Sequence, residues 1–281
     1  MTKLTGMGRS RLDRTTQMPL AKFVPSALTL LALCAGLSSI RFAFAEDWRG
    51  AVAAIVCAAI LDTLDGRVAR LLKANSLMGA QLDSLADLVN FGVAPSLLIY
   101  MWTLRDAGLA GWALVLFFCS CSALRLARFN VESVDPDQSV GPAPHFTGLP
   151  TPAAACLVFI PMLISFQFHD PFFRDPILSA GMITLTSCLM ISRVPTLSVK
   201  HVHIPRRLRA AVIGFVGVLL GLAIMFPWST LTSTLLLYLA TIPVGAVTLG
   251  ESPRLQRWRA RRLQRRQNRA FILDEDDDEL L

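Results

Sequence analysis

The chain has 281 residues, of which 53% are hydrophobic, and its 27 basic and 20 acidic residues give a formal net charge of +7. The mean hydropathy of +0.52 is too high for a soluble domain, and the apolar residues come in long blocks, so the composition predicts an integral membrane protein. The basic residues flank these blocks and no nucleic-acid recognition motif accompanies them, which argues against a nucleic-acid-binding protein.

Eight apolar segments are long enough to be expected as membrane-spanning helices. In chain order they cover residues 23–44, 50–66, 85–103, 108–127, 151–168, 177–193, 209–227 and 230–249. The second and third have low hydropathy because they carry acidic residues, so they must be shielded by other helices or open to a water-filled cavity. The expected fold is an all-α membrane domain over residues 23–250. A basic segment over residues 1–22 precedes it, and a charged tail over residues 251–281, disordered at its acidic end, follows it.

The basic residues also predict an orientation. Eight spans place both ends of the chain on one side of the membrane, and 23 of the 27 basic residues fall in segments on that side. The remaining four are Arg41, Arg49, Arg105 and Arg174. Because positive charge accumulates on the cytosolic side, both termini are expected in the cytosol, in a multi-pass protein of the cell's inner membrane.

Four aspartates interrupt the second and third apolar segments. Asp62 and Asp65 are three residues apart, and Asp83 and Asp87 are four apart, so each pair lies on one face of a helix. A carboxylate within a membrane is costly and is functional by default. Four converging carboxylates favour a hard divalent cation, so the sequence predicts a site for Mg²⁺ or Mn²⁺, with two ions expected. Ion pairing with nearby arginines is the other interpretation, but it would leave acidic groups unpaired.

Small residues and one arginine lie beside these acids. Gly66 and Gly79 have no side chains, so a phosphate or nucleotide can approach the helix backbone there. The small side chain of Ala69 leaves the same face of the helix accessible. The guanidinium group of Arg70 can donate to phosphate oxygens as a planar fork. Helix packing, which is common for glycine in membranes, is the alternative for the two glycines.

Together these residues form the pattern D-x2-D-G-x2-A-R-x8-G-x3-D-x3-D from Asp62 to Asp87. The pattern resembles the signature of the CDP-alcohol phosphotransferase family at all eight fixed positions. Two further stretches resemble the bacterial and archaeal phosphatidylserine synthase branch of that family. They are Asp83–Pro95, which reads DSLADLVNFGVAP with Asn90 where the branch more often has serine, and Arg125–Ala155, which contains RLARFN and later FTGLPTPAAA.

The resemblance covers about residues 23–250 and implies a six-helix core with a cavity facing the cytosol. Members exchange the CMP of a CDP-linked lipid for an alcohol, with a divalent metal, and the branch joins CDP-diacylglycerol to L-serine. The implied metal ligands are Asp62, Asp65, Asp83 and Asp87, with Asp87 also the general base. The implied residues for the CDP-lipid are Asp62, Gly66, Ala69, Arg70 and Gly79. Candidate acceptor-binding residues are Arg125, Arg128 and Thr147, although both arginines also fit as charges that anchor the end of a span.

Two alternatives remain open. Glycerol 3-phosphate or an inositol phosphate could be the acceptor, but each brings a phosphate and would favour extra basic residues near the cavity. A divalent-cation transporter would need polar residues through the full depth of several spans, whereas these acids gather at one end. The expected partners are CDP-diacylglycerol, L-serine and membrane lipids, with a homodimer as a candidate assembly.

Overall fold

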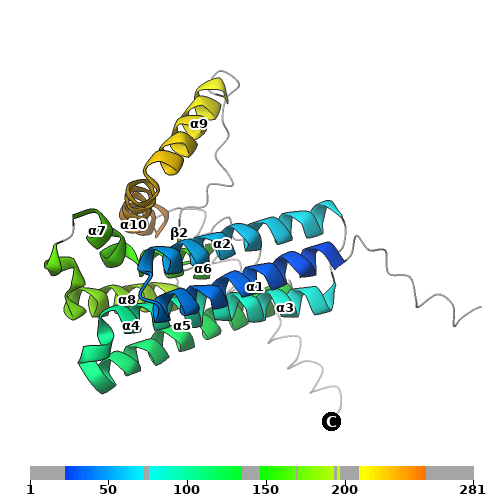
Figure 1. Ribbon diagram of the computed structural model, residues 1–281. Coiled ribbons are helices and arrows are strands. Elements are labelled where there is room, and N and C mark those ends of the chain that lie inside the picture. Colours follow the sequence, from blue (N-terminus) through cyan, green and yellow to red (C-terminus); the bar gives the residue numbers. More distant parts are fainter. Residues whose placement is uncertain are drawn as a thin grey trace, which may run out of the picture. The chain divides into compact units, whose positions relative to one another are not determined.

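The computed structural model describes residues 23–72, 76–134, 146–147, 149–168, 170–192, 195–196 and 209–250, which form two compact units (Figure 1). The first unit contains α1 (Phe23–Phe44), α2 (Trp48–Leu71), α3 (Leu77–Leu88), η2 (Val89–Val93), α4 (Ala94–Trp102), η3 (Leu104–Ala107), α5 (Gly108–Val134), α6 (Thr151–Leu157), α7 (Ile160–Phe168), η4 (Pro171–Arg174) and α8 (Pro176–Ile191). The second contains β1 (Phe146–Thr147), β2 (Pro195–Thr196), α9 (Arg209–Met225) and α10 (Pro227–Gly250). The predicted N-terminal segment and charged tail lie outside the described residues.

Within the described residues, four helical segments are long and apolar enough to cross a membrane. They are Phe23–Phe44, Leu77–Trp102, Leu104–Val131 and Thr151–Phe168, and α8 is a shorter apolar helix. The prediction of a helical membrane protein is therefore confirmed, while the number of eight spans stays a prediction. The third span begins at Leu77, whereas the sequence predicted its start at residue 85. Its aspartates lower the local hydropathy without interrupting the helix, so the apolar segment in the sequence is shorter than the helix.

One element departs from the all-α prediction. Strands β1 and β2 pair antiparallel, with Phe146 opposite Thr196 and Thr147 opposite Pro195. Each strand has two residues, which is too short for an alternating pattern to be visible in the sequence.

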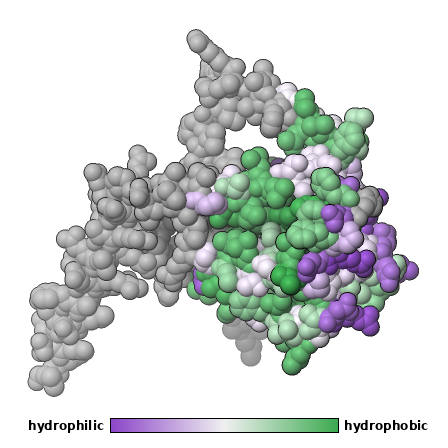
Figure 2. Space-filling model, turned by 90° about the vertical axis from the view of Figure 1, so that its left-hand side faces the viewer, coloured by the Kyte–Doolittle hydropathy of each residue, from purple (hydrophilic) through white to green (hydrophobic). Residues whose placement is uncertain are grey.

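Apolar side chains cover much of the described surface, as expected for helices that face lipid. Figure 2 shows hydrophobic residues over much of the described face in view, with hydrophilic residues along its right-hand side. Among the exposed large side chains are Leu30 and Leu37 on α1 and Leu116 and Leu124 on α5. A soluble protein would bury such a surface, whereas a lipid environment stabilises it.

Helix α1 packs closely beside α2 and η2 because its buried face is made of small residues. The buried positions are Pro25, Thr29, Ala32, Gly36, Ser39 and Ala43, at alternating spacings of four and three residues. Small side chains let helix backbones approach each other in a membrane. Helices α1 and α2 are joined by a tight turn. The Asp47 carboxylate then caps α2 by accepting a hydrogen bond from the Gly50 N–H, 2.9 Å away.

The span that carries Asp83 and Asp87 contains a π-helical turn, η2, directly after α3. The Ala94 N–H donates to the carbonyl of Val89, five residues back. Pro95 has no N–H, and its ring would clash with the carbonyl four residues earlier in a regular helix, so the wider turn accommodates it. The Ser96 hydroxyl lies 2.9 Å from two carbonyl oxygens of η2, to which it can donate. The Ser96 hydroxyl thus helps to satisfy backbone carbonyl groups where the regular helical hydrogen bonds are interrupted.

Gly36 offers a test of the packing of α1 on η2. A methyl group on Gly36 would collide with the side-chain amide of Asn90, which is 1% exposed and has no hydrogen-bond partner among the described residues. We expect Gly36→Ala to lower the free energy of unfolding by about 1–3 kcal/mol, because a packed interior gives way only at a cost. Adding Asn90→Ala should recover part of the loss, since it removes the colliding group. The thermal unfolding midpoint in detergent measures both effects.

Gly181 on α8 is the matched control, because a methyl group there would meet no atom within 4 Å in the part of the chain that the structure describes. Equal losses of stability in Gly36→Ala and Gly181→Ala would contradict the expected collision.

Candidate functional site

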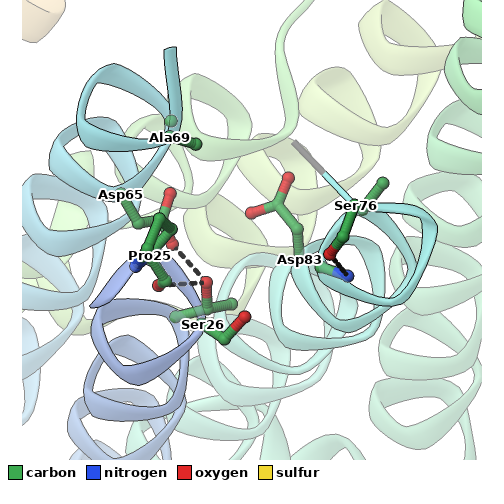
Figure 3. A pocket seen from close by; sticks show the side chains of 10 residues that line it. Pro25, Ser26, Asp65, Ala69, Ser76 and Asp83 are labelled. Carbon is green, nitrogen blue, oxygen red and sulfur yellow. Dashed lines mark hydrogen bonds between the residues drawn. The ribbon is translucent and has the colours of Figure 1, made fainter. Parts of the chain in front are cut away.

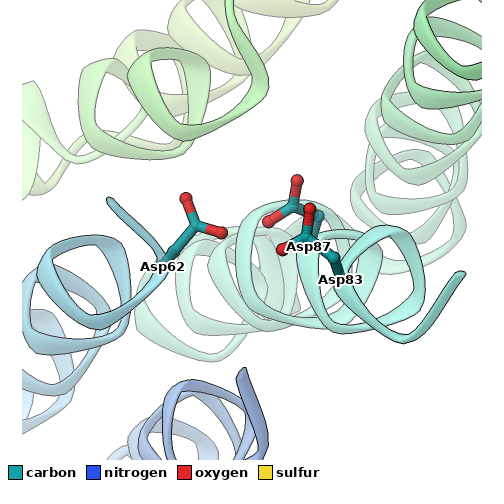
Figure 4. A group of neighbouring side chains, drawn as sticks. All are labelled: Asp62, Asp83 and Asp87. Atoms are coloured by element: carbon teal, nitrogen blue, oxygen red, sulfur yellow. The ribbon is translucent and has the colours of Figure 1, made fainter. Parts of the chain in front are cut away.

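Three of the four predicted acids meet between α2 and α3. One carboxylate oxygen from each of Asp62, Asp83 and Asp87 lies within 4.8 Å of the others, and Figure 4 shows Asp62 of α2 facing the two aspartates of α3. We call these three residues the acid group. Carboxylates this close repel one another in a partly buried setting unless a cation offsets their charge. Hard oxygen donors at short mutual distance are the set that a divalent cation such as Mg²⁺ or Mn²⁺ takes, so the residues fit the predicted metal.

Asp65 lies apart from the acid group. Its side chain is 3% exposed, and its Oδ2 accepts a hydrogen bond from the hydroxyl of Thr29 on α1, 2.7 Å away. The structure thus brings Asp62, Asp83 and Asp87 together and turns Asp65 toward a neighbouring helix.

A cavity of about 210 Å³ lies where α1 and α3 begin and α2 ends. Figure 3 shows its walls, with Pro25 and Ser26 from α1, Asp65 and Ala69 from α2, and Asp83 from α3 together with Ser76, the N-cap of that helix. Asp83 belongs both to the acid group and to the lining of the cavity. A ligand in the cavity would therefore lie directly beside the acid group.

The predicted small residues line this cavity. A methyl group on Gly66 would meet no atom of the described residues within 4 Å, so the backbone of α2 is open to the cavity there. Gly79 is in the first turn of α3, and its N–H donates to the hydroxyl of Ser76, which caps the helix at 3.0 Å. The N-terminal turn of a helix favours negative charge, so this wall of the cavity suits a phosphate group.

Arg70 lies at the same end of α2. Its Nε–H donates to the carbonyl of Gly66, one turn earlier, at 3.0 Å, and its side chain is exposed. The bond holds the guanidinium group beside a residue that lines the cavity.

The predicted acceptor-binding residues are spread more widely. Arg128 on α5 donates from Nη1 to the carbonyl of Ile191, the last residue of α8, at 3.4 Å. Arg125 is half-buried one turn earlier on the same helix. Thr147 is in β1 of the second unit, so the described geometry does not connect it with the acids.

Sequence reasoning missed the residues that α1 contributes. Ser26 and Thr29 line the cavity, and their hydroxyl groups in the first two turns of a mainly apolar helix were the available signal. It also missed a hydrogen bond between α3 and α5, in which the Asn130 amide donates to the hydroxyl of Ser84 at 2.9 Å. Ser84 follows Asp83 directly, so this bond helps to hold the helix that carries two of the acids.

The helices that form this site lie in the region of the chain that matches a known protein family. A family model described as CDP-alcohol phosphatidyltransferase matches residues 22–196, which include α1 to α8. The chain belongs to this family. The resemblance seen in the aspartate pattern is therefore confirmed, and α9 and α10 lie beyond the residues matched to the CDP-alcohol phosphatidyltransferase model.

Similar proteins with assigned names carry the comparison further. The chain is 39% identical over 240 residues to a Mycobacterium leprae protein named CDP-diacylglycerol–serine O-phosphatidyltransferase, with 85% of this chain and 78% of the relative covered. A Mycobacterium bovis protein of the same name is 36% identical over 239 residues, covering 85% and 81%. A Helicobacter pylori protein of the same name is 37% identical over 217 residues, covering 76% and 87%.

Proposed function

We propose that the protein transfers a phosphatidyl group from CDP-diacylglycerol to L-serine, giving phosphatidylserine and CMP. The observation that carries the proposal is the acid group beside a cavity with an open helix backbone, in a family member whose similar proteins bear the name of this activity. The cavity offers open backbone at Gly66 and a helix N-terminus to a phosphate, and Arg70 is held beside it.

The proposed reaction is a substitution at phosphorus. The serine hydroxyl oxygen attacks the phosphorus that bears the diacylglycerol, a P–O bond to serine forms, and the P–O bond to CMP breaks as CMP leaves with the electron pair. Asp87 accepts the hydroxyl proton as general base, because an alcohol is a poor nucleophile until a neighbouring group takes its proton. Asp62, Asp83 and Asp87, with Asp65 as a further ligand, would hold divalent cations, whose positive charge would offset the charge of the pyrophosphate.

The acceptor distinguishes this proposal from its alternatives. Purified protein in detergent should release CMP from CDP-diacylglycerol when L-serine is present, and much less with glycerol 3-phosphate or inositol phosphate. Faster release with a phosphorylated acceptor would overturn the choice of serine and leave the acid group unaffected. The carboxylate of serine needs a donor, and Arg125 and Arg128 are proposed for that part, with Thr147 near the acceptor.

The divalent cation can be tested in the same assay. Excess EDTA should abolish CMP release, and added Mg²⁺ or Mn²⁺ should restore the activity. The reason is that divalent cations supply the positive charge that the proposed reaction needs at the acid group. Turnover that continues at full rate in EDTA would contradict the proposed metal site. Divalent-cation uptake by vesicles that contain the protein would instead support the transporter.

The membrane orientation is proposed from charge. The apolar segments predict eight spans, and the distribution of basic residues then predicts that both termini and the cavity face the cytosol in the inner membrane. In a cysteine-free background, a membrane-impermeant thiol reagent applied to intact cells should label Phe172→Cys. The same reagent should label Asn75→Cys only after the cells are opened. Labelling of Asn75→Cys in intact cells would reverse the orientation.

A further inference from the structure

Thr29 links the first two helices at the wall of the cavity. Its hydroxyl lies 2.7 Å from Oδ2 of Asp65 and 3.1 Å from the carbonyl oxygen of Pro25 in the preceding turn of α1. Both side chains are buried, with Thr29 at 5% and Asp65 at 3% exposed. A hydroxyl has a single hydrogen, and a carboxylate is a stronger acceptor than a backbone carbonyl, so the bond to Asp65 is favoured.

This bond explains why Asp65 differs from the other acids. A carboxylate has two oxygens, and here one of them is engaged by α1 while the side chain still lines the cavity. Asp65 is three residues from Asp62 on α2 and lines the same cavity as Asp83, so a rotation of its side chain would carry its second oxygen away from a cation held beside these acids. The hydroxyl of Thr29 restricts that rotation.

We propose that Thr29 is a positioning residue, which fixes the carboxylate of Asp65 through its hydroxyl and thereby strengthens the binding of a divalent cation at this site. The proposal rests on the metal site of the proposed function but does not depend on which alcohol is the acceptor. A partner that hydrogen-bonds a ligand carboxylate fixes its orientation, and losing such a partner typically costs about 10–100-fold in metal affinity.

The test is binding of Mn²⁺ to purified protein without substrate, with free Mn²⁺ measured by electron paramagnetic resonance. Thr29→Val keeps the shape of the side chain and removes the donor, so we expect its dissociation constant for Mn²⁺ to rise about tenfold. Thr29→Ser keeps the donor, and its dissociation constant should stay within about twofold of the original. Thr63→Val is the matched control, because Thr63 is exposed and, within the described part of the chain, its hydroxyl donates only to the carbonyl of Ala59 on its own helix, at 2.9 Å.

The thermal unfolding midpoint separates positioning from folding. Thr29→Ala is a second variant without the donor and should weaken Mn²⁺ binding as Thr29→Val does. An unchanged dissociation constant for Mn²⁺ in either of these variants would overturn the proposal. Unfolding of both variants would also overturn it, because Thr29 would then have a purely structural role. Absence of Mn²⁺ binding to the original protein would overturn it too. Failure of serine to release CMP, with Mn²⁺ binding intact, would instead count against the proposed function alone.

Discussion

Replacing Asp87 with asparagine is expected to lower kcat by about 10²–10⁴-fold at saturating Mn²⁺, because an amide cannot accept the proton of the acceptor hydroxyl. Asparagine has nearly the same size as aspartate, so the packing of α3 against α2 should be kept. The measurement is the initial rate of CMP release over a range of serine and CDP-diacylglycerol concentrations.

Asp106→Asn is the matched control for this variant. Asp106 is an exposed aspartate in η3, outside the acid group and outside the lining of the cavity. Its replacement should leave kcat unchanged. A kcat for Asp87→Asn within threefold of the original would move the general base to another residue, although the acid group could still bind metal.

Gly66→Leu is the second change with a large expected effect. The backbone of Gly66 is open to the cavity, so a leucine side chain there would occupy space proposed for the CDP-lipid. We expect kcat/KM for CDP-diacylglycerol to fall by about 10²-fold or more, because a small displacement of the reacting groups already costs that much. Stability should be kept or slightly raised, because leucine favours a helix more than glycine does.

Gly181→Leu separates this effect from a general effect on helices. Gly181 also lies within a helix, and a methyl group there meets no atom within 4 Å, but it does not line the cavity. The rate of CMP release should be unchanged in that variant. If both leucine variants lost activity equally, the cavity beside Gly66 would not be the lipid-nucleotide site.

The sequence predicted the helices better than the contacts between them. The first span was predicted at its observed limits, residues 23–44, because an uninterrupted apolar block has clear ends. The convergence of Asp62, Asp83 and Asp87 followed from helical periodicity, since residues three or four apart share a face. The separate place of Asp65 could not be foreseen, because its partner Thr29 is 36 residues away on another helix.

The π-helical turn was also missed, although the sequence contains its cause. Pro95 inside an apolar segment indicates an interruption of the helical hydrogen bonds, but not whether the helix kinks, ends or widens. The neighbours decide that outcome, because Gly36 lets α1 come close to Asn90 and Ser96 satisfies carbonyls of η2. These are contacts between distant segments, which periodicity does not encode.

The π-helical turn determines how this span tolerates a change of length. It holds one residue more than an α-helical turn would need, and one residue corresponds to about 100° around a helix axis. Because the wider turn absorbs that residue, Asp83 and Asp87 keep the direction relative to α4 that a regular helix with one residue fewer would give them. Pro95 is the residue that favours the wider turn, so a relative with a single-residue gap within Val89–Val93 and no proline at position 95 would keep its acids facing Asp62. Such a gap beside the aspartate signature would therefore not by itself mark an inactive relative.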